Sequence, residues 1–314
     1  MTMGDAPSAS GVLPYLVRLF SDPAIIRAPA HIRYPLSVYI ALKKYGTMSA
    51  RYRAIGGGSP MNAITMRQAE ALERRLNESG SFRVYVANRY CKPNTSDAYR
   101  SMKADGVKKL IALPLFPQYS TATTGSSFDE LKRLLSKDAV PPEVNWVNSF
   151  CDLPGYVSAF SKKIAEAIDS LPEDARRDVQ VLFSAHSLPH EFIKQGDRYL
   201  DEIRQTLTGV IKTLKPAFFH LCFQSKGGGK REWLKPETEE VLKEIAGKGR
   251  KSAVIVPVSF VAENIETLYD AEILYGKMAE SLGIMLVRAK CLDDAPEFID
   301  ALAGVVIKAV TPAA

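Results

Sequence analysis

One histidine and two glutamates are the strongest candidates for catalytic or metal-binding groups in this sequence. Among the four histidines of the chain, His186 directly follows a run of apolar and β-branched residues. That is the position of a loop after a buried strand, where functional residues concentrate. Glu263 and Glu266 lie three residues apart at the expected start of a helix, so they should share one face of it. One imidazole with one or two carboxylates can exchange protons and suits a divalent metal such as iron.

Each of these residues also has an ordinary structural interpretation. A single histidine is more often a hydrogen-bonded structural residue than a catalyst, and carboxylates in a first helical turn are common partners of the helix dipole. Two other patterns are weaker still. The glycines at 227–229 lack the spacing of a phosphate loop, and the serines around His186 form no nucleophile elbow. The histidine and the two glutamates therefore form the strongest candidate site.

Predicted strands and helices alternate along the chain around these residues. Short apolar or β-branched segments predict seven strands, at 83–87, 109–115, 144–148, 179–184, 217–223, 253–259 and 284–289. Amphipathic segments predict helices at 65–77, 126–136, 155–170, 199–214, 237–246 and 295–310. Strands that alternate with helices indicate an α/β fold with parallel sheets flanked by helices.

The number of strands predicts two doubly wound lobes of similar size. The boundary is expected near residue 150, giving lobes 1–150 and 151–314, and the helix at 295–310 could pack on either lobe. In such sheets, ligands bind beyond the carboxyl ends of the strands. The most unusual segments of the chain begin at those ends, at 114–120, 183–189 and 257–266. This topology predicts that the histidine and both glutamates lie near one cleft.

The composition is that of an ordinary globular protein. The chain has 314 residues, of which 46% are hydrophobic and 24% charged, and its net charge is +6. No apolar run reaches the roughly 18–20 residues that span a bilayer, and no signal peptide is visible. The four cysteines are far apart, which is unlike a zinc or iron–sulfur site. The basic stretches at 226–231 and 248–251 are short and glycine-rich, so we expect solvated loops and no nucleic-acid partner.

Five segments of the chain, taken together, resemble the ferrochelatase family. They cover almost the whole chain in the order of the family, at 52–60, 113–125, 183–189, 222–226 with 232–236, and 257–270. Each motif alone is moderately specific, whereas five in register are highly specific.

The resemblance implies two lobes with four-stranded parallel sheets and a porphyrin cleft between them. It implies insertion of Fe²⁺ into a free-base porphyrin to form haem, with release of two protons. His186 and Glu266 match the central pair, as metal ligands and catalytic groups, and Glu263 matches an outer catalytic relay. Porphyrin contacts map onto Met3, Arg51, Tyr52, Ser59 and Tyr119.

The chain departs from the family pattern at three places. Asn264 stands where relatives often have histidine, so a proton relay through that position loses its usual carrier. The cysteine-bearing C-terminal extension of animal-type members has no match, so we expect no iron–sulfur cluster and no cofactor, since Fe²⁺ is a substrate. Relatives also begin with an apolar strand ahead of Met3. We therefore expect a start site placed too far downstream and a first lobe that lacks an interior strand.

The segment 25–42 combines apolar and aromatic residues with Arg27 and Arg33. In related enzymes this region forms a lip at the porphyrin mouth, which predicts weak association with anionic lipid. A pair of helices that packs against its own lobe is the alternative. The expected location is cytoplasmic, with peripheral contact at the inner face of the membrane, and the sequence leaves the oligomeric state open.

Several related functions compete with the main prediction. The segment 117–125 favours protoporphyrin IX as the substrate, with coproporphyrin III as the nearest variant. A cobalt or sirohaem chelatase is a second possibility, although that group generally lacks the motif at 115–120. A non-catalytic tetrapyrrole carrier is a third, but retention of the histidine and both glutamates argues against it.

Overall fold

The computed structural model describes residues 1–228 and 231–310. The chain forms two compact units, which are described separately here. Unit 1 comprises Met1–Phe150 with the C-terminal segment from Asp293, and unit 2 comprises Cys151–Leu292. The segment from Asp293, which the sequence left free to join either lobe, thus lies in unit 1 and not in the lobe 151–314.

Unit 2 is built on a parallel sheet of four strands in the order β4-β3-β5-β6. The strands are β3 (Gln180–His186), β4 (Phe218–Gln224), β5 (Ser252–Pro257) and β6 (Met285–Arg288). The central strands β3 and β5 are buried along almost their full length. Near-continuous apolar strands of this kind require cover on both faces of the sheet.

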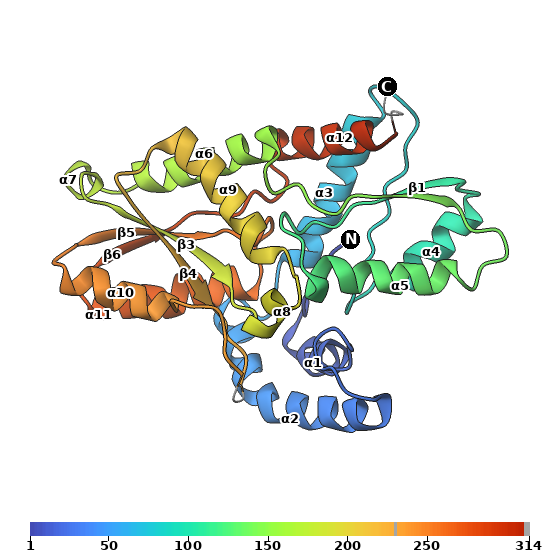
Figure 1. The fold of residues 1–314 in the computed structure, drawn as a ribbon, viewed down its shortest axis with the longest axis horizontal. Coiled ribbons are helices and arrows are strands. Elements are labelled where there is room, and N and C mark those ends of the chain that lie inside the picture. The colour runs from blue at the N-terminus through green and yellow to red at the C-terminus, as the bar shows by residue number, and fades with distance from the viewer. Residues whose placement is uncertain (229–230, 311–314) are drawn as a thin grey trace. The chain divides into compact units, whose positions relative to one another are not determined.

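Helices supply that cover. In Figure 1, α6 (Pro154–Asp169) and α9 (Tyr199–Leu214) lie on one face, and α10 (Thr238–Gly247) and α11 (Tyr275–Ser281) lie on the other. The core on the second face joins Leu182, Cys222 and Ile255 of the sheet to apolar residues of α10 and α11. The short helices α7 (Glu173–Arg176) and α8 (His190–Lys194) lie in connections, and a π-helix, η3 (Glu266–Leu274), runs directly into α11.

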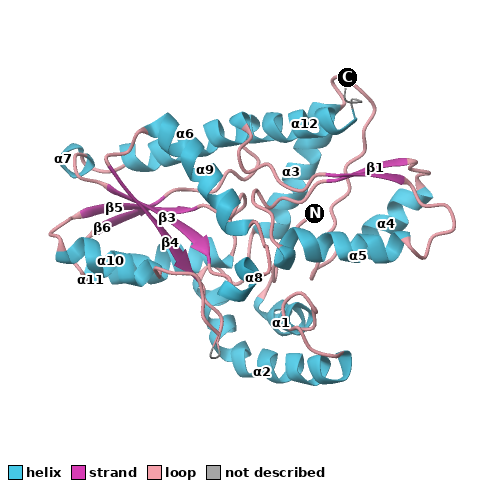
Figure 2. Ribbon diagram, in the orientation of Figure 1, coloured by secondary structure: helices cyan, strands magenta, loops and turns pink. Residues whose placement is uncertain are grey.

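Unit 1 has a smaller sheet, shown in magenta in Figure 2. Its parallel ladder pairs β1 (Lys109–Ala112) with β2 (Glu143–Trp146). Helices α4 (Thr95–Ala104) and α5 (Ser126–Leu135) pack on one face, around Tyr99, Phe128 and Trp146. Helix α3 (Met61–Leu76) packs with α12 (Pro296–Val310), and α12 contacts β2. The remaining helices are η1 (Ala9–Gly11), α1 (Val12–Phe20), α2 (Ala30–Ala54) and the short π-helix η2 (Thr121–Gly125).

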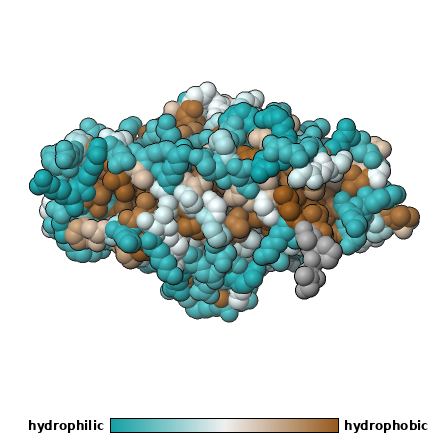
Figure 3. Space-filling model, turned by 90° about the horizontal axis from the view of Figure 1, so that it is seen from above, coloured by the Kyte–Doolittle hydropathy of each residue, from teal (hydrophilic) through white to brown (hydrophobic). Residues whose placement is uncertain are grey.

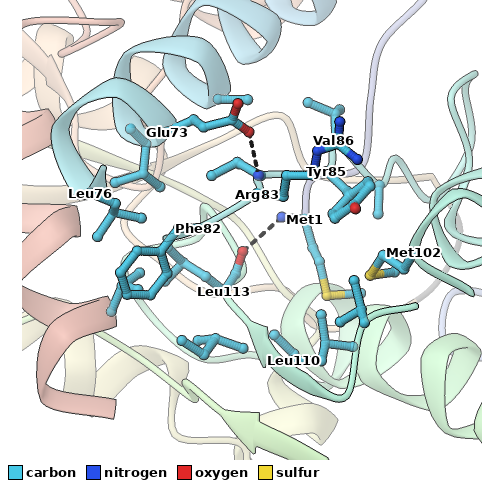
Figure 4. Close-up of a pocket in the computed structure, with 18 of the residues that line it drawn as sticks. Met1, Glu73, Leu76, Phe82, Arg83, Tyr85, Val86, Met102, Leu110 and Leu113 are labelled. Atoms are coloured by element: carbon cyan, nitrogen blue, oxygen red, sulfur yellow. Dashed lines mark hydrogen bonds between the residues drawn. The ribbon is translucent and has the colours of Figure 1, made fainter. Parts of the chain in front are cut away.

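The predicted strand at 83–87 does not form, so the expectation of four strands in both lobes is wrong for unit 1. Thr2 forms an isolated bridge to Asn88, just after the segment, and its amide donates to the carbonyl of Ala87, while the amide of Val84 donates to the side chain of Glu73. Between this segment and β1 lies a cavity of about 690 Å³, lined by apolar residues that include Leu76, Phe82 and Leu110 (Figure 4). The segment forms no ladder, because a strand needs a neighbour within about 5 Å to pair with.

Hydrophilic residues cover most of the face drawn in Figure 3, and apolar residues show between them as separate patches. Within the described ranges, we find no helix with the combined length and apolarity that crossing a bilayer demands.

Candidate functional site

The centre of the candidate site is a direct contact between His186 and Glu266. Nδ1 of His186 lies 2.7 Å from a carboxylate oxygen of Glu266, and the two side chains are 35% and 25% exposed. His186 is the last residue of β3, and Glu266 is the first residue of η3. The carboxyl end of a central strand therefore presents the imidazole to the amino end of a helix, where the helix dipole favours a carboxylate.

The contact shifts both proton affinities toward an ion pair. Burial lowers the pKa of His186, but the charge and hydrogen bond of Glu266, with the charge of Asp270, outweigh it and raise the pKa above its usual value. Burial raises the pKa of Glu266, but the charge and hydrogen bond of His186, with hydrogen bonds from Ser225 and Gln224, lower it overall. The pair can therefore hold a proton on the imidazole while the carboxylate stays charged.

The backbone of His186 is held from both sides. The hydroxyl of Tyr199 donates to the carbonyl of His186 at 3.0 Å, and the amide of His186 donates to Oγ of Ser259 at 3.3 Å. The hydroxyls of Tyr199 and Ser259 lie 2.6 Å apart. No local sequence pattern indicates these two contacts, because they join residues that are 13 and 73 positions away from His186.

Asn264 fixes the position of Glu266. Its side-chain oxygen accepts the amide of Glu266 at 2.8 Å and that of Thr267 at 3.3 Å, and its side-chain nitrogen donates to the carbonyl of Ala262. These are the contacts of a helix cap. The expectation that Glu263 and Glu266 share a helical face is therefore wrong, because the helix begins at Glu266 and Glu263 precedes the cap.

Glu263 faces a buried arginine. One of its oxygens accepts Nη1 of Arg288 at 2.7 Å and the amide of Cys291 at 3.0 Å, and the other accepts the hydroxyl of Thr267 at 2.5 Å. The side chains of Arg288 and Glu263 are 8% and 12% exposed. The structure thus brings Glu266, but not Glu263, into hydrogen-bonding contact with His186.

A second acid, missed by the sequence analysis, lies close to the pair. Asp270 is buried, accepts the hydroxyl of Ser225 at 2.7 Å, and contributes to the raised pKa of His186. Ser225 follows β4 with a left-handed backbone (φ 58°), which is uncommon for a residue other than glycine. The register of the sheet pairs His186 with Gln224, the residue before Ser225. The register of the sheet therefore places the end of β4, with Ser225, next to His186.

The predicted porphyrin contacts lie in unit 1. Tyr52 is fully buried and donates to the carboxylate of Asp5, whereas Arg51, Met3 and Tyr119 are partly exposed. Ser59 is buried, and its hydroxyl accepts the amide of Met61 at 3.3 Å.

The donor set for a metal is small. Among the described residues, no three histidine, cysteine or acidic side chains converge as a preformed metal site would require. The four cysteines are buried. Burial raises the pKa of the Cys91 thiol to about 11 and that of the Cys222 thiol to about 12. Thiols with such pKa values stay protonated near neutral pH, and metals bind the thiolate form.

Comparison with known proteins places this geometry in context. The chain is 41% identical to a ferrochelatase of Citrifermentans bemidjiense over 98% of its own length and 96% of that protein. It is 42% identical to a ferrochelatase of Geotalea uraniireducens over 99% and 97% of the two lengths. Among solved structures, SirB from Bacillus subtilis with Fe³⁺ matches with a TM-score of 0.58 and 12% identity, over 78% of this chain and 89% of SirB. That match shows a shared fold.

The family model for ferrochelatase matches residues 1–310. This match includes residues of both units. It also contains the end of β3 and the start of η3, which bring His186 to Glu266. Together with relatives at about 40% identity over nearly the full chain, it shows that the protein belongs to the ferrochelatase family, the enzymes that insert ferrous iron into porphyrin in haem biosynthesis.

Proposed function

We propose that this ferrochelatase acts on protoporphyrin IX, with His186 and Glu266 as the central pair of the reaction. The observation that carries the assignment of roles is the 2.7 Å contact between Nδ1 of His186 and Glu266. It commits Nδ1 to the carboxylate and leaves Nε2 as the ring atom that meets the substrate. The segment 117–125 favours protoporphyrin IX, and coproporphyrin III is the alternative substrate.

The chemistry requires a porphyrin to lose two protons while it gains one Fe²⁺. In the proposed mechanism, Nε2 of His186 accepts a pyrrole proton, and Glu266 stabilises the imidazolium through the bond from Nδ1–H. The raised pKa of His186 supports this role, because it makes the imidazole a stronger proton acceptor. Asp270 adds a further negative charge near the ring and can receive the proton on its way to solvent.

His186 and Glu266 are also the proposed ligands of the incoming iron. A nitrogen and a carboxylate oxygen suit Fe²⁺, and a pair of ligands leaves coordination positions open for the porphyrin nitrogens. The small number of converging donors among the described residues supports transfer of the metal over storage. The imidazole can bind iron only when it is neutral, so metal binding and proton acceptance compete for the same group.

Unit 1 supplies the proposed porphyrin contacts. Met3, Tyr119 and Arg51 are partly exposed, as substrate contacts must be, and Arg51 can pair with a porphyrin carboxylate. Tyr52 is fully buried against Asp5. We therefore assign it the role of supporting its neighbour Arg51, and Ser59 that of shaping the adjacent turn.

We propose that the reaction needs no bound cofactor and no iron–sulfur cluster. The wide spacing of the four cysteines along the chain supports this, because iron–sulfur clusters are typically ligated by closely spaced cysteines. The substrates themselves balance the reaction, since the metal keeps its oxidation state and the two protons leave.

The decisive experiment is an anaerobic insertion assay with Fe²⁺, run with protoporphyrin IX and coproporphyrin III side by side. We expect the spectrum of the metallated product with both, and a higher kcat/KM with protoporphyrin IX. A higher kcat/KM with coproporphyrin III would reverse the substrate assignment. A shift in the porphyrin spectrum without metallated product would identify a tetrapyrrole carrier and refute the proposed activity.

We further propose that the cytoplasmic enzyme touches an anionic membrane surface through α2. Five large side chains of this helix are at least 45% exposed: Ile32, Tyr34, Val38, Tyr39 and Leu42. Such a concentration of exposed apolar residues is typical of an interaction surface. Lys43 and Lys44 on the same helix add the positive charge that anionic lipids attract.

Liposome co-sedimentation at low salt tests this contact. We expect partial binding to vesicles that contain anionic lipid, weaker binding in high salt, and a clear loss of binding in the double variant Tyr39→Ser/Leu42→Ser. Val140→Ser is the control, because Val140 is 69% exposed in the same unit but lies outside α2. Failure to bind anionic vesicles even at low salt would favour α2 as a helix that packs only within the protein.

A further inference from the structure

An arginine outside the catalytic pair is connected to both ends of the helical turns that carry Glu266. Arg288 is the last residue of β6, and its side chain is 8% exposed. Nη1 lies 2.7 Å from Glu263, three residues before Glu266, and Nη2 lies 2.8 Å from Glu272, six residues after it. Nε of Arg288 also donates to Glu272 at 3.0 Å.

The two acids differ in burial. Glu263 is 12% exposed and makes further hydrogen bonds to the amide of Cys291 and the hydroxyl of Thr267. Glu272 is 55% exposed. The guanidinium thus bridges buried Glu263, which precedes the cap, and exposed Glu272, which lies inside η3. Arginine can make such a bridge because its planar guanidinium carries several donors in a fork, whereas lysine has no fork.

These contacts involve η3, the π-helix that carries Glu266. A π-helix is rare and occurs mostly as short segments within or beside α-helices, often at functional sites. Glu266 is its first residue, so its side-chain position depends on where the helix begins. Asn264 fixes that start locally through the amides of Glu266 and Thr267. Thr267, in turn, is bonded to Glu263, so the cap and the ion pair are one connected network.

We propose that Arg288 is a positioning residue for the reaction: by bridging Glu263 and Glu272, it holds η3 against β6 and keeps the carboxylate of Glu266 on Nδ1 of His186. This inference rests on the proposed roles of His186 and Glu266. It also makes Glu263 a structural partner of Arg288 and not a proton relay. Its oxygens are engaged by Arg288, Cys291 and Thr267, so its charge holds the network in place.

The test compares Arg288→Met, which keeps the aliphatic stem, with Arg288→Lys and Glu272→Gln. Arg250→Met is the matched control, because Arg250 also pairs with an acid in unit 2, at 3.3 Å from Asp178, but lies at the other end of the sheet. Each variant is assayed for kcat, for KM of the porphyrin and for the pH profile, with the melting temperature measured in parallel. Glu272 is half-exposed, so Glu272→Gln keeps the fold even where Arg288→Met does not.

We expect Arg288→Met to lower kcat by about tenfold or more, with the KM for porphyrin within about twofold. The acid limb of the pH profile should move to lower pH, because a displaced Glu266 no longer raises the pKa of His186. Arg288→Lys should recover part of kcat and part of the original pH position of the acid limb. Glu272→Gln should lower kcat and shift the acid limb in the same direction, but by less. Arg250→Met should leave the limb where it is.

A lower melting temperature with kcat and the pH limb unchanged would show that Arg288 is merely structural and would overturn the proposal. If Arg288→Met failed to fold, an acid limb at unchanged pH in Glu272→Gln would overturn the proposal as well. If His186→Ala retained activity, the proposed function itself would fail, and that result is distinguishable because it does not depend on Arg288.

Discussion

At the scale of single residues, the site depends on one short contact across 80 positions of sequence. Nδ1 of His186 and the carboxylate of Glu266 lie 2.7 Å apart, and each shifts the pKa of the other toward the charged form. The exposure of the two side chains, 35% and 25%, leaves the ring accessible. This combination of partial burial and a specific charged partner is typical of catalytic groups.

The variant His186→Ala should lose most of its activity while it keeps its fold. No other histidine occupies the strand end, so we expect kcat to fall at least about 100-fold. Binding of porphyrin, followed by fluorescence titration, should be largely retained. His31→Ala is the control, since His31 is exposed and lies in unit 1. Turnover near that of the unchanged enzyme would remove His186 from the mechanism.

The variant Glu266→Gln should lose more activity than Glu263→Gln, because only Glu266 contacts His186. Its acid limb should also move to lower pH. The carboxylate raises the pKa of His186, so its neutralisation lets the imidazole lose its proton at lower pH. Glu263→Gln should instead lower stability, by about 3 kcal/mol, since it removes a charged partner from the buried guanidinium of Arg288. Initial rates against pH and urea denaturation measure the two effects, and equal or reversed losses of activity would contradict this ranking.

At the scale of elements, the start of η3 decides where Glu266 lies. The apolar pattern after β5 predicts a helix there, but it cannot distinguish a helix that includes Glu263 from one that begins after a cap. Asn264 makes that choice, because its short side chain accepts two amides of the first turn. The residue that departs from the family pattern in the sequence thus has a structural role in this chain.

Replacing the cap should affect both stability and rate. Asn264→Ala removes the acceptor for two amides and should cost about 1 kcal/mol in the free energy of unfolding. It should also lower kcat, because the helix start that carries Glu266 frays. Asn264→Asp keeps the acceptor and should retain most of both quantities. If Asn264→Ala were as active as the unchanged enzyme, the cap would have no part in placing Glu266.

At the scale of the whole molecule, the chain returns to unit 1 after it has completed unit 2. Helix α12 is attached there by two kinds of contact. The side chains of Phe298, Ile299 and Leu302 are at most 4% exposed. At the surface, Arg67 and Arg75 of α3 pair with Asp294 and Asp300 at 3.1 Å and 2.6 Å.

These contacts should contribute very differently to stability. Phe298→Ala opens a cavity beside Phe150 and should cost about 3–5 kcal/mol. Arg75→Ala breaks an ion pair whose side chains are 40% and 58% exposed, so it should cost far less, because solvent screens exposed ion pairs. Chemical denaturation measures both. A larger loss from Arg75→Ala would show that ion pairs, and not apolar packing, hold α12.

Most of the helices and strands, and their order, follow from local patterns in the sequence. Periodicity predicted helices α9 and α12 to within one residue of their bounds, and six of the seven predicted strands form. The same patterns also marked His186, Glu263 and Glu266 as candidates, because a strand end and a helix start are local features that composition and turn residues indicate. The resemblance to ferrochelatases then ranked Glu266 as the central glutamate. The segment 83–87 has the composition of a strand but forms none, since pairing needs a neighbour that no local pattern supplies.

The division of roles among the side chains follows from contacts that form only in the folded chain. Two glutamates three residues apart look equivalent in the sequence. One lies against His186, and the other lies against Arg288 on the neighbouring strand β6. Tyr199, Ser259 and Asp270 also join the site, although no local pattern marks any of them as a functional residue. The reason is physical: local sequence sets backbone conformation within a few residues, whereas charge pairing and burial depend on distances that exist only once the sheet has formed.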